Sequence, residues 1–342
     1  MKQIFKYIAI ILIVAVISSG VTWYAKPTPT VEEVPLDVVV YALEWSAAGY
    51  PWHVGAYVAY EKGWFEENGI AITIQRGYGS SDTVKRIATG TATFGVADMS
   101  TMISLKSNEG LEVKAIGAMF HSWPLSTLTL AGSGINEPKD LEGRTLGEDA
   151  GSEVHVLFPA YCKVVGIDIE KVNIVTIAPS AIYSSLAVGD VDAINGWNTV
   201  TVYLEPEFDI DINAIKWSDY GFSLYSHCLH TSEALIEENP DLVQRFVDAI
   251  YRGIQWSIEN KEEAMDIFQS YHPESVREYD MGRFDLSVEL MDDVISTGAT
   301  GKGLGLINRE KLQMTRDTLV EYLELPTVPS LDDIYTDQFC QD

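Results

Sequence analysis

The chain has few basic residues for its size. Among its 342 residues, 23 are Lys or Arg and 50 are Asp or Glu, which gives a formal net charge of -27 at pH 7. Nucleic-acid binding needs clustered Lys and Arg to neutralise phosphates, so this composition argues against nucleic acid as a partner. We expect the acidic surface to serve mainly solubility.

Cysteines are also scarce, and they are far apart. Cys162, Cys228 and Cys340 are the three in the sequence. An oxidising compartment would permit one disulfide, but the spacing does not say which two residues would form it. We expect isolated buried thiols.

Familiar catalytic and cofactor motifs are missing. The sequence has no phosphate-binding GxxxxGK loop, no His and Cys cluster with metal spacing and no evident nucleophile with its base. We therefore predict no cofactor, no metal and no catalytic residue.

What the sequence does contain begins with an export segment. Lys2 and Lys6 precede an apolar run from Tyr7 to Ile17, and small residues follow at 18–20. This order is typical of an export signal, for which we predict residues 1–25. Apolar residues continue to Ala25, so an uncleaved membrane anchor is the alternative. Either way we expect an extracytoplasmic location, in the periplasm or at the cell surface.

Residues 26–36 follow as a linker. They include Pro27, Pro29 and Pro35 among Thr and Glu. Because proline cannot continue a helix, we predict an extended tether between the export segment and a folded body.

The stretch from Leu43 to Ile74, together with the apolar strand at 38–43 that leads into it, predicts a βαβ unit. After the first strand come an aromatic loop and a helix with Val54, Tyr57 and Val58 on one face. The unit ends in a strand in which apolar residues alternate with other residues. The crossover makes the two strands parallel. Ligands bind beyond the carboxyl ends of such strands, where this chain has aromatic side chains.

Two later turns also follow predicted strands of this sheet. One leads through Ser80 and Asp82 into a helix, and the other leads through Asp98 and Met99 into the next helix. Backbone N–H groups at such helix starts bind a ligand oxygen in some proteins, whereas plain helix capping is the alternative. Both turns should open on one crevice.

A second α/β pattern follows the strand at 125–131. We predict the first crossing between two lobes at Gly132 to Gly134 and the return crossing as a strand from Gly221 to Leu229. Lobe 1 would comprise residues 37–131 and 226–342, and lobe 2 residues 132–225. Leu242, Phe246 and their helical repeats predict core helices that pack behind lobe 1.

Four segments together resemble a known family: residues 57–65, 90–98, 138–147 and 189–193. The chain resembles the extracytoplasmic solute-binding proteins of ABC importers, in the branch that binds sulfonates, taurine, nitrate and thiamine-pyrimidine precursors. The resemblance covers about residues 37–325. It implies a type II periplasmic binding fold: two α/β lobes, each a mostly parallel sheet flanked by helices, joined by a two-strand hinge. It also implies closure on a small molecule, delivery to an ABC permease in the membrane, and a chain that acts as a monomer.

The expected cleft is rich in aromatic and acidic residues, with Arg76, His53 and His121 as its basic candidates. Such a site suits a planar nitrogenous ring, similar to a thiamine-pyrimidine precursor, and the alternative is a sulfonate, taurine or nitrate. We expect Trp45 and Trp197, from opposite lobes, to sandwich the ligand. The predicted ligand-binding residues are Trp45, Trp52, His53, Tyr78, Ser80, Asp98, Met99, Trp123, Glu148, Ser152, Asn195 and Trp197.

An enzyme is the alternative of another class. Pyrimidine-biosynthesis proteins related to this branch carry a cysteine-rich run, and in this chain the cysteines are dispersed. We therefore predict a binding protein rather than an enzyme; a sensory ectodomain is a third reading.

Overall fold

The computed structural model describes residues 35–48, 51–149, 152–291 and 301–341. The predicted export segment and almost all of the predicted linker lie outside these residues. Residues Leu36–Asp342 make up one compact unit. In the part that the structure describes, no helix combines the length and the apolar character needed to cross a membrane.

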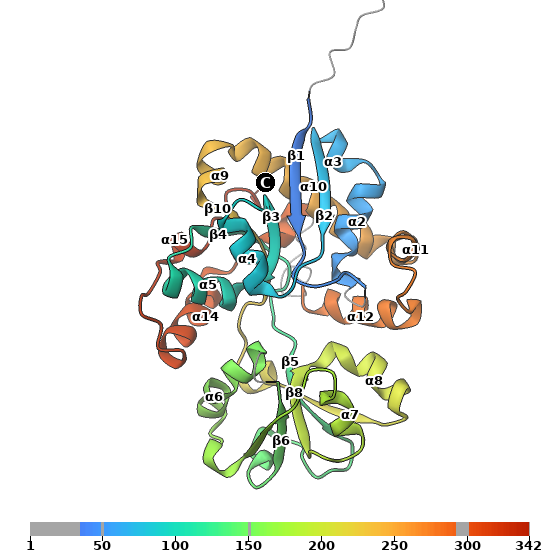
Figure 1. Cartoon of the computed structure of the whole chain (residues 1–342), viewed down its shortest axis with the longest axis vertical. Helices are drawn as coiled ribbons and strands as arrows, with labels where there is room; N and C mark the ends of the chain where they lie inside the picture. The colour runs from blue at the N-terminus through green and yellow to red at the C-terminus, as the bar shows by residue number, and fades with distance from the viewer. Residues whose placement is uncertain (1–34, 49–50, 150–151, 292–300, 342) are drawn as a thin grey trace, which may run out of the picture. The chain divides into compact units, whose positions relative to one another are not determined.

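The first sheet has the strand order β2-β1-β3-β10-β4. Strand β1 pairs in parallel with β2 and β3, and β10 runs antiparallel to its neighbours β3 and β4. We call the part of the chain around this sheet lobe 1 (Figure 1). Its strands are β1 (Asp37–Ala42), β2 (Ile70–Gln75), β3 (Phe94–Asp98), β4 (Val113–Ala118) and β10 (His227–Ser232).

The second sheet repeats this arrangement with the order β7-β6-β8-β5-β9. Strand β6 pairs in parallel with β7 and β8, and β5 runs antiparallel to β8 and β9. We call its surroundings lobe 2. Its strands are β5 (Leu125–Leu130), β6 (Thr145–Glu148), β7 (Asn173–Thr176), β8 (Ala193–Trp197) and β9 (Ile212–Lys216). The predicted fold class, two lobes with mostly parallel sheets, is confirmed.

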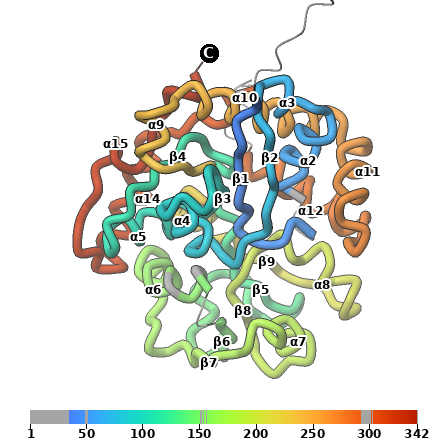
Figure 2. The backbone as a smooth tube through the Cα atoms, turned by 45° about the horizontal axis from the view of Figure 1, so that its top comes forward, coloured from blue at the N-terminus to red at the C-terminus, as the bar shows by residue number. Residues whose placement is uncertain are grey.

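Helices flank both sheets. Figure 2 shows that the last third of the chain, from α10 to α15, returns to lobe 1. The helices of lobe 2 are α6 (Glu153–Val165), α7 (Ile182–Ala187) and α8 (Thr201–Phe208), with the short η4 (Asn198–Val200). Those of lobe 1 are η1 (Pro51–His53), α2 (Val54–Glu61), α3 (Trp64–Glu67), α4 (Ser80–Ala88), α5 (Met99–Glu109), α9 (Glu233–Glu238), α10 (Pro240–Glu259), α11 (Lys261–Tyr271), α12 (Arg277–Glu289), η6 (Gly301–Gly305), α14 (Arg309–Tyr322) and α15 (Leu331–Ile334).

The first crossing between the lobes lies earlier than predicted. Strand β5 pairs with β8 and β9 of lobe 2, so the chain crosses at residues 119–124 and the predicted boundary after Ala131 is wrong. Gly132 and Gly134 do adopt left-handed φ values of 80° and 83°, but they form the turn that follows β5. Left-handed glycines mark a turn, and a turn alone does not say which sheet the preceding strand joins.

The return crossing occupies residues 221–226, and β10 begins at His227. Both crossings are irregular segments rather than the strands expected for the hinge. The acidic residues and Pro206 at 205–211 predict a loop, yet α8 extends to Phe208, because Leu204 is buried in the core of lobe 2 and packing there outweighs the local preference of Pro206. Trp197, which follows the predicted strand from Gly189 to Ile194 and was expected in the loop after it, is the last residue of β8.

The core of lobe 1 depends on a close contact between α2 and α10. A Cβ atom on Gly253 would overlap the carbonyl oxygen of Gly55, so only glycine permits this approach of the two helices. Further along α10, Phe246 stacks on Phe94 of β3 with ring centroids 3.8 Å apart. The helix is therefore fixed against the sheet, as its repeat of apolar residues predicts.

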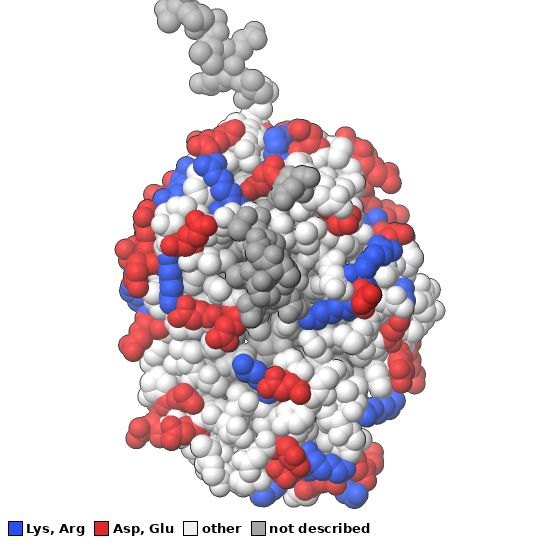
Figure 3. Space-filling view, turned by 180° about the vertical axis from the view of Figure 1, so that it is seen from behind, with Lys and Arg blue, Asp and Glu red and all other residues white. Residues whose placement is uncertain are grey.

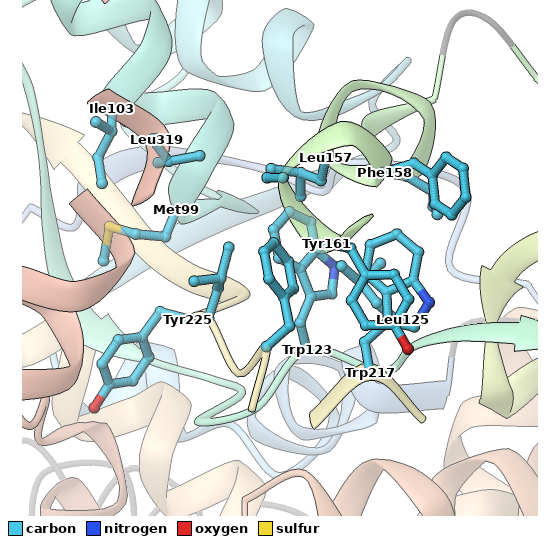
Figure 4. Packing of buried hydrophobic residues seen from close by; sticks show 14 of the residues in the cluster. Met99, Ile103, Trp123, Leu125, Leu157, Phe158, Tyr161, Trp217, Tyr225 and Leu319 are labelled. Carbon is cyan, nitrogen blue, oxygen red and sulfur yellow. The ribbon is translucent and has the colours of Figure 1, made fainter. Parts of the chain in front are cut away.

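A second core continues from lobe 1 into lobe 2 past the first crossing. Figure 4 shows Met99, Ile103 and Leu319 of lobe 1 on one side of Trp123, with Leu157, Phe158, Tyr161 and Trp217 of lobe 2 on the other. Tyr161 and Trp217 stack with centroids 4.2 Å apart. On the face shown in Figure 3, acidic side chains lie over both lobes with Lys and Arg among them.

Candidate functional site

A cavity of about 240 Å³ lies between the two lobes. Lobe 1 contributes Trp45, from the segment after β1, and Arg283 of α12. Lobe 2 supplies the remaining lining residues: Asp149, Ser152, Val154, Pro179, Ile182, Tyr183, Asn195, Gly196, Trp197, Val200 and Tyr203. The cavity thus combines aromatic walls with an acid, an amide, a hydroxyl and a guanidinium.

Trp45 is positioned by a tight turn. A Cβ on Gly77 would overlap the Leu43 carbonyl oxygen, so the turn fits only because glycine has no side chain. Gly79, with a φ of 107°, donates from its N–H to the Glu44 carbonyl at 2.6 Å, and a Cβ there would touch the Trp45 indole at 3.6 Å. Trp45 remains 40% exposed. One face of its indole is therefore free to meet a ligand.

Trp197 enters from lobe 2 and packs against lobe 1. Its ring centroid lies 5.7 Å from that of Trp52 and 5.3 Å from that of His227. Trp52 is 1% exposed and also packs against Phe120. Trp52 therefore supports Trp197 from behind, while Trp197 faces the cavity.

A chain of hydrogen bonds orients Asn195. Its amide nitrogen donates to Glu148 Oε1 at 2.8 Å, and its oxygen accepts from Thr127 at 2.8 Å. The other Glu148 oxygen lies 2.6 Å from His155 Nδ1. Burial raises the pKa of Glu148, and the hydrogen bonds from His155 and Asn195 oppose this shift. Glu148 thus acts as a buried support for Asn195.

Arg283 belongs to the buried face of α12 and is 8% exposed. Its guanidinium carbon lies 5.3 Å from the ring centre of Tyr203, in lobe 2. It also lies 6.0 Å from the ring centre of Trp52, in lobe 1. Both distances allow cation–π attraction, so Arg283 contacts aromatic rings of both lobes.

His53 packs against Trp52, with ring centroids 5.8 Å apart, and is 1% exposed. Burial lowers the pKa of His53 to about 3, with His227 and His272 adding to the effect. The ring is therefore neutral near pH 7 and does not supply a positive charge. His121 is buried as well, and its Nε2 lies 3.1 Å from the Leu304 carbonyl oxygen.

The two helix-start turns of lobe 1 serve local structure. Asp98 caps α5 by accepting from the N–H groups of Ser100 and Thr101. Ser80 accepts from the Asp98 N–H at 3.0 Å and donates to Glu44 at 3.5 Å, and the Glu44 carboxylate contacts Nε2 of the buried His227. Met99 is fully buried in the core. These predicted residues lie near one another, but they do not line the cavity described above.

Tyr78 and Trp123 lie elsewhere. Tyr78 is 69% exposed, with Arg76 over its ring at 4.8 Å. Trp123 is buried in the core at the first crossing and borders a separate cavity of about 450 Å³ between α12 and lobe 2. Of the predicted residues, the cavity near Arg283 brings together Trp45, Ser152, Asn195 and Trp197.

Arg283, Tyr183 and Tyr203 were not predicted. The helices after β10 were interpreted as core that packs behind lobe 1, yet α12 contacts α8 and η4 of lobe 2. One signal was present in the sequence: Asp280, Arg283 and Ser287 share a helix face with Phe284, and all four are buried. Charged residues on an otherwise inward face indicate a site or an ion pair.

Two α/β lobes around an aromatic cavity define the class of protein. The fold is that of the periplasmic binding proteins. The structure superimposes on the periplasmic aliphatic sulphonate binding protein SsuA from Escherichia coli with a TM-score of 0.68 and 13% identity, over 89% of this chain and 99% of the other.

The sequence places the chain within one family of this class. The NMT1/THI5 like family matches residues 50–264, more than half of the chain, and the protein belongs to that family. In the ranges that the structure describes, no three His, Cys, Asp or Glu side chains are grouped so as to hold a metal ion.

Relatives include both binding proteins and enzymes. A formylaminopyrimidine-binding protein of Halalkalibacterium halodurans is 25% identical over 79% of this chain and 80% of its own length. The riboflavin-binding protein RibY of Chloroflexus aurantiacus is 26% identical over 64% of this chain and 62% of its own. A 4-amino-5-hydroxymethyl-2-methylpyrimidine phosphate synthase of Legionella pneumophila is 25% identical over 66% of this chain and 71% of its own.

Proposed function

We propose that this protein is the solute-binding component of an ABC importer and captures a small planar nitrogenous ligand between its lobes. The observation that carries the proposal is the placement of Trp45 of lobe 1 and Trp197 of lobe 2 on the same cavity. A flat ring between two indoles would touch both lobes, so binding it would favour the closed arrangement.

Polar groups around the cavity suit a nitrogen heterocycle. Asp149 lines the cavity with a carboxylate-bearing side chain, and the Asn195 amide is held in one orientation by Glu148 and Thr127. A fixed amide beside an acid recognises ring N–H groups and ring nitrogens at a defined edge, which gives specificity to an otherwise apolar stack. The named ligands of two relatives, formylaminopyrimidine and riboflavin, are planar rings of this kind.

A sulfonate or another small anion is the second candidate. Arg283 favours it, because a buried guanidinium on the cavity wall binds anionic oxygens well. The cavity wall also contains Tyr183 and Tyr203 beside the two indoles, and this number of aromatic rings supports the planar ligand instead.

An enzyme is the candidate of another class, since one relative is named a synthase. The dispersed positions of Cys162, Cys228 and Cys340 support binding, because the pyrimidine-biosynthesis proteins carry a cysteine-rich run that is missing from this sequence. We propose accordingly that the ligand is released unchanged to a membrane permease, outside the cytoplasm, by a monomeric chain.

A thermal-shift screen tests the proposal. Pyrimidines, riboflavin, quaternary amines, alkyl sulfonates and nitrate are each added to the purified chain. Ligand that binds the folded state alone raises the melting temperature, by an amount equivalent to about 2.7 kcal/mol at 100 times Kd. A planar nitrogenous compound should give the largest shift and be recovered unaltered by mass spectrometry. A shift from sulfonate or nitrate alone contradicts the proposed ligand, and turnover contradicts the binding role.

A further inference from the structure

Asn195 is a polar group on the cavity wall whose orientation is set from two sides. It lies on β8, lines the interlobe cavity and is 7% exposed. Its side-chain nitrogen donates to Glu148 Oε1, and its oxygen accepts from the Thr127 hydroxyl, both at 2.8 Å. A terminal amide has two N–H groups and two oxygen lone pairs, and these bonds use one of each. The second N–H and the second lone pair remain for a ligand.

The direction of the bond from Thr127 follows from Trp217. The indole nitrogen of Trp217 donates to the Thr127 oxygen at 3.1 Å. An indole N–H only donates, so it cannot take the hydroxyl proton, and that proton is available for the Asn195 oxygen. Thr127 is fully buried, so water does not compete for the bond. The Thr127 side of the amide therefore has to be its oxygen.

The Glu148 side requires the same orientation independently. An ionised carboxylate only accepts hydrogen bonds, and the second Glu148 oxygen lies 2.6 Å from His155 Nδ1. Turning the amide over would bring its oxygen against a carboxylate oxygen, and two acceptors would then be buried against each other. Glu148 is 2% exposed, so such a mismatch would not be relieved by solvent. Both ends of the chain thus hold the Asn195 nitrogen toward Glu148.

We propose that Thr127 and Glu148 are positioning residues that hold the Asn195 amide in one orientation, so that the cavity accepts one order of hydrogen-bond donor and acceptor along the edge of a ligand. This inference rests on the proposed function and narrows it. An amide free to flip would offer its N–H and its oxygen in either order, whereas a held amide selects between heterocycles of the same shape. Thr127 and Glu148 are not among the described residues that line the cavity, so both act through Asn195.

Two pyrimidines of the same shape with opposite edges provide the test. 4-Aminopyrimidine has an acceptor nitrogen beside an N–H donor, and 4(3H)-pyrimidinone has an N–H donor beside a carbonyl acceptor. NMR titration near pH 8, where both compounds are uncharged, compares their Kd values. The wild type should bind one of them about 10-fold more tightly than the other, because the mismatched edge leaves polar groups unpaired.

A variant that removes the restraint at both ends should lose this preference. In Thr127→Val/Glu148→Gln, valine cannot donate, and the glutamine amide offers either an oxygen or an N–H to Asn195. The two Kd values should then come within about 2-fold of each other. Thr127→Ser/Glu148→Gln is the matched control. It retains the hydroxyl at position 127 and should keep the preference of the wild type.

The orientation of the amide can also be tested without a ligand. Asn195→Asp places a second carboxylate against Glu148 and should lower the melting temperature by about 5 °C. In Asn195→Asp/Glu148→Gln the glutamine N–H faces the new carboxylate and Thr127 still donates to it, so most of the loss should be recovered. This pair decides the orientation even if Thr127→Val/Glu148→Gln does not fold.

The outcomes separate this inference from the proposed function. Equal binding of both pyrimidines by the wild type overturns the selection and leaves the planar ligand in place. A preference that persists in Thr127→Val/Glu148→Gln, or that both double variants lose alike, overturns the positioning role. If Glu148→Gln does not recover the stability of Asn195→Asp, the orientation of the amide is wrong. If neither pyrimidine binds the wild type, the inference and the proposed function fail together.

Discussion

The two lobes share a strand order and differ in what they bring to the cavity. An edge strand of lobe 1 is β2, and the corresponding edge strand of lobe 2 is β7. In each sheet, the strand that follows a crossing between the lobes runs antiparallel to the other strands: this strand is β10 in lobe 1 and β5 in lobe 2. Yet lobe 1 contributes Trp45 and Arg283, whereas lobe 2 contributes eleven of the thirteen lining residues. The two lobes therefore share the topology of their sheets, whereas the loops and helices around each sheet determine which side chains line the cavity.

In lobe 2, hydrogen bonds between side chains fix the orientation of the polar groups. The hydrogen bonds from Trp217 through Thr127, Asn195 and Glu148 to His155 connect three strands and a helix within one lobe. Lobe 1 instead offers side chains at its rim, on a glycine turn and on α12. Lobe 2 thus holds its polar groups in a hydrogen-bonded network and lobe 1 adds individual side chains, and the following predictions test this contrast.

The largest effect is expected in the core of lobe 1. Gly253→Ala places a Cβ against the Gly55 carbonyl and forces α10 away from α2. Overpacking of this kind should lower the free energy of unfolding by about 3 kcal/mol. The control is Gly196→Ala in lobe 2, where the nearest atom to a new Cβ is Leu128 Cδ1 at 3.7 Å and the change should stay below about 1 kcal/mol. Urea denaturation measures both, and equal losses would contradict the glycine contact.

The next effect distinguishes the two indoles of the cavity. Trp197→Ala should weaken binding of the planar ligand by about 3 kcal/mol, because its ring is supported by Trp52 and His227. Trp45→Ala should cost only about 1 kcal/mol, since that ring is 40% exposed. Isothermal calorimetry measures both. A neutral result for either variant would rule out the sandwich.

Acid should destabilise lobe 1 through its buried histidines. Burial lowers the pKa of His53 and of His230 to about 3, while the unfolded chain has the ordinary value of 6.5. As pH falls from 6.5 toward 3, the unfolded state binds protons that the folded state does not. Each histidine should therefore remove up to about 1.4 kcal/mol of stability per pH unit within that window.

Denaturation at pH 7 and pH 5 tests this pH dependence. His230→Leu should reduce the difference in stability between the two pH values, since leucine does not titrate. An unchanged difference in His230→Leu would contradict the role of this buried histidine.

The smallest effect concerns the contact between the lobes. In Gly282→Ala the new Cβ would lie 2.6 Å from Val202 Cγ1, so α12 and α8 must separate slightly. Ligand binding should weaken by about 1 kcal/mol, with stability without ligand nearly unchanged because helical Gly→Ala is itself favourable. Calorimetry and thermal unfolding give the two values. Val202→Ala should restore binding in the double variant, and failure to do so would place the cause elsewhere.

Much of the fold was predictable because its signals are local. The sequence predicts helices at about 153–165 and 261–271 and a helix cap at Ser232. Helix α6 at Glu153–Val165 and α11 at Lys261–Tyr271 have these bounds, and Ser232 caps α9. Apolar periodicity and capping residues act within a few positions of the chain, so they are visible without the structure. The first crossing was misplaced because strand pairing is a long-range choice between two sheets.

The sequence by itself determined the two α/β patterns, the aromatic segment around Trp45 and the position of Asn195 and Trp197 near one another along the chain. Only the tertiary structure decided that Trp52 supports Trp197, that Asp98 caps α5 while Ser80 accepts from its N–H group, and that Arg283 reaches the cavity. The physical reason is that the periodicity of apolar residues indicates which face of a helix is buried. It does not indicate which other segment packs against that face. The inward face of α12 meets the opposite lobe, and contacts between distant segments have no local signal in the chain.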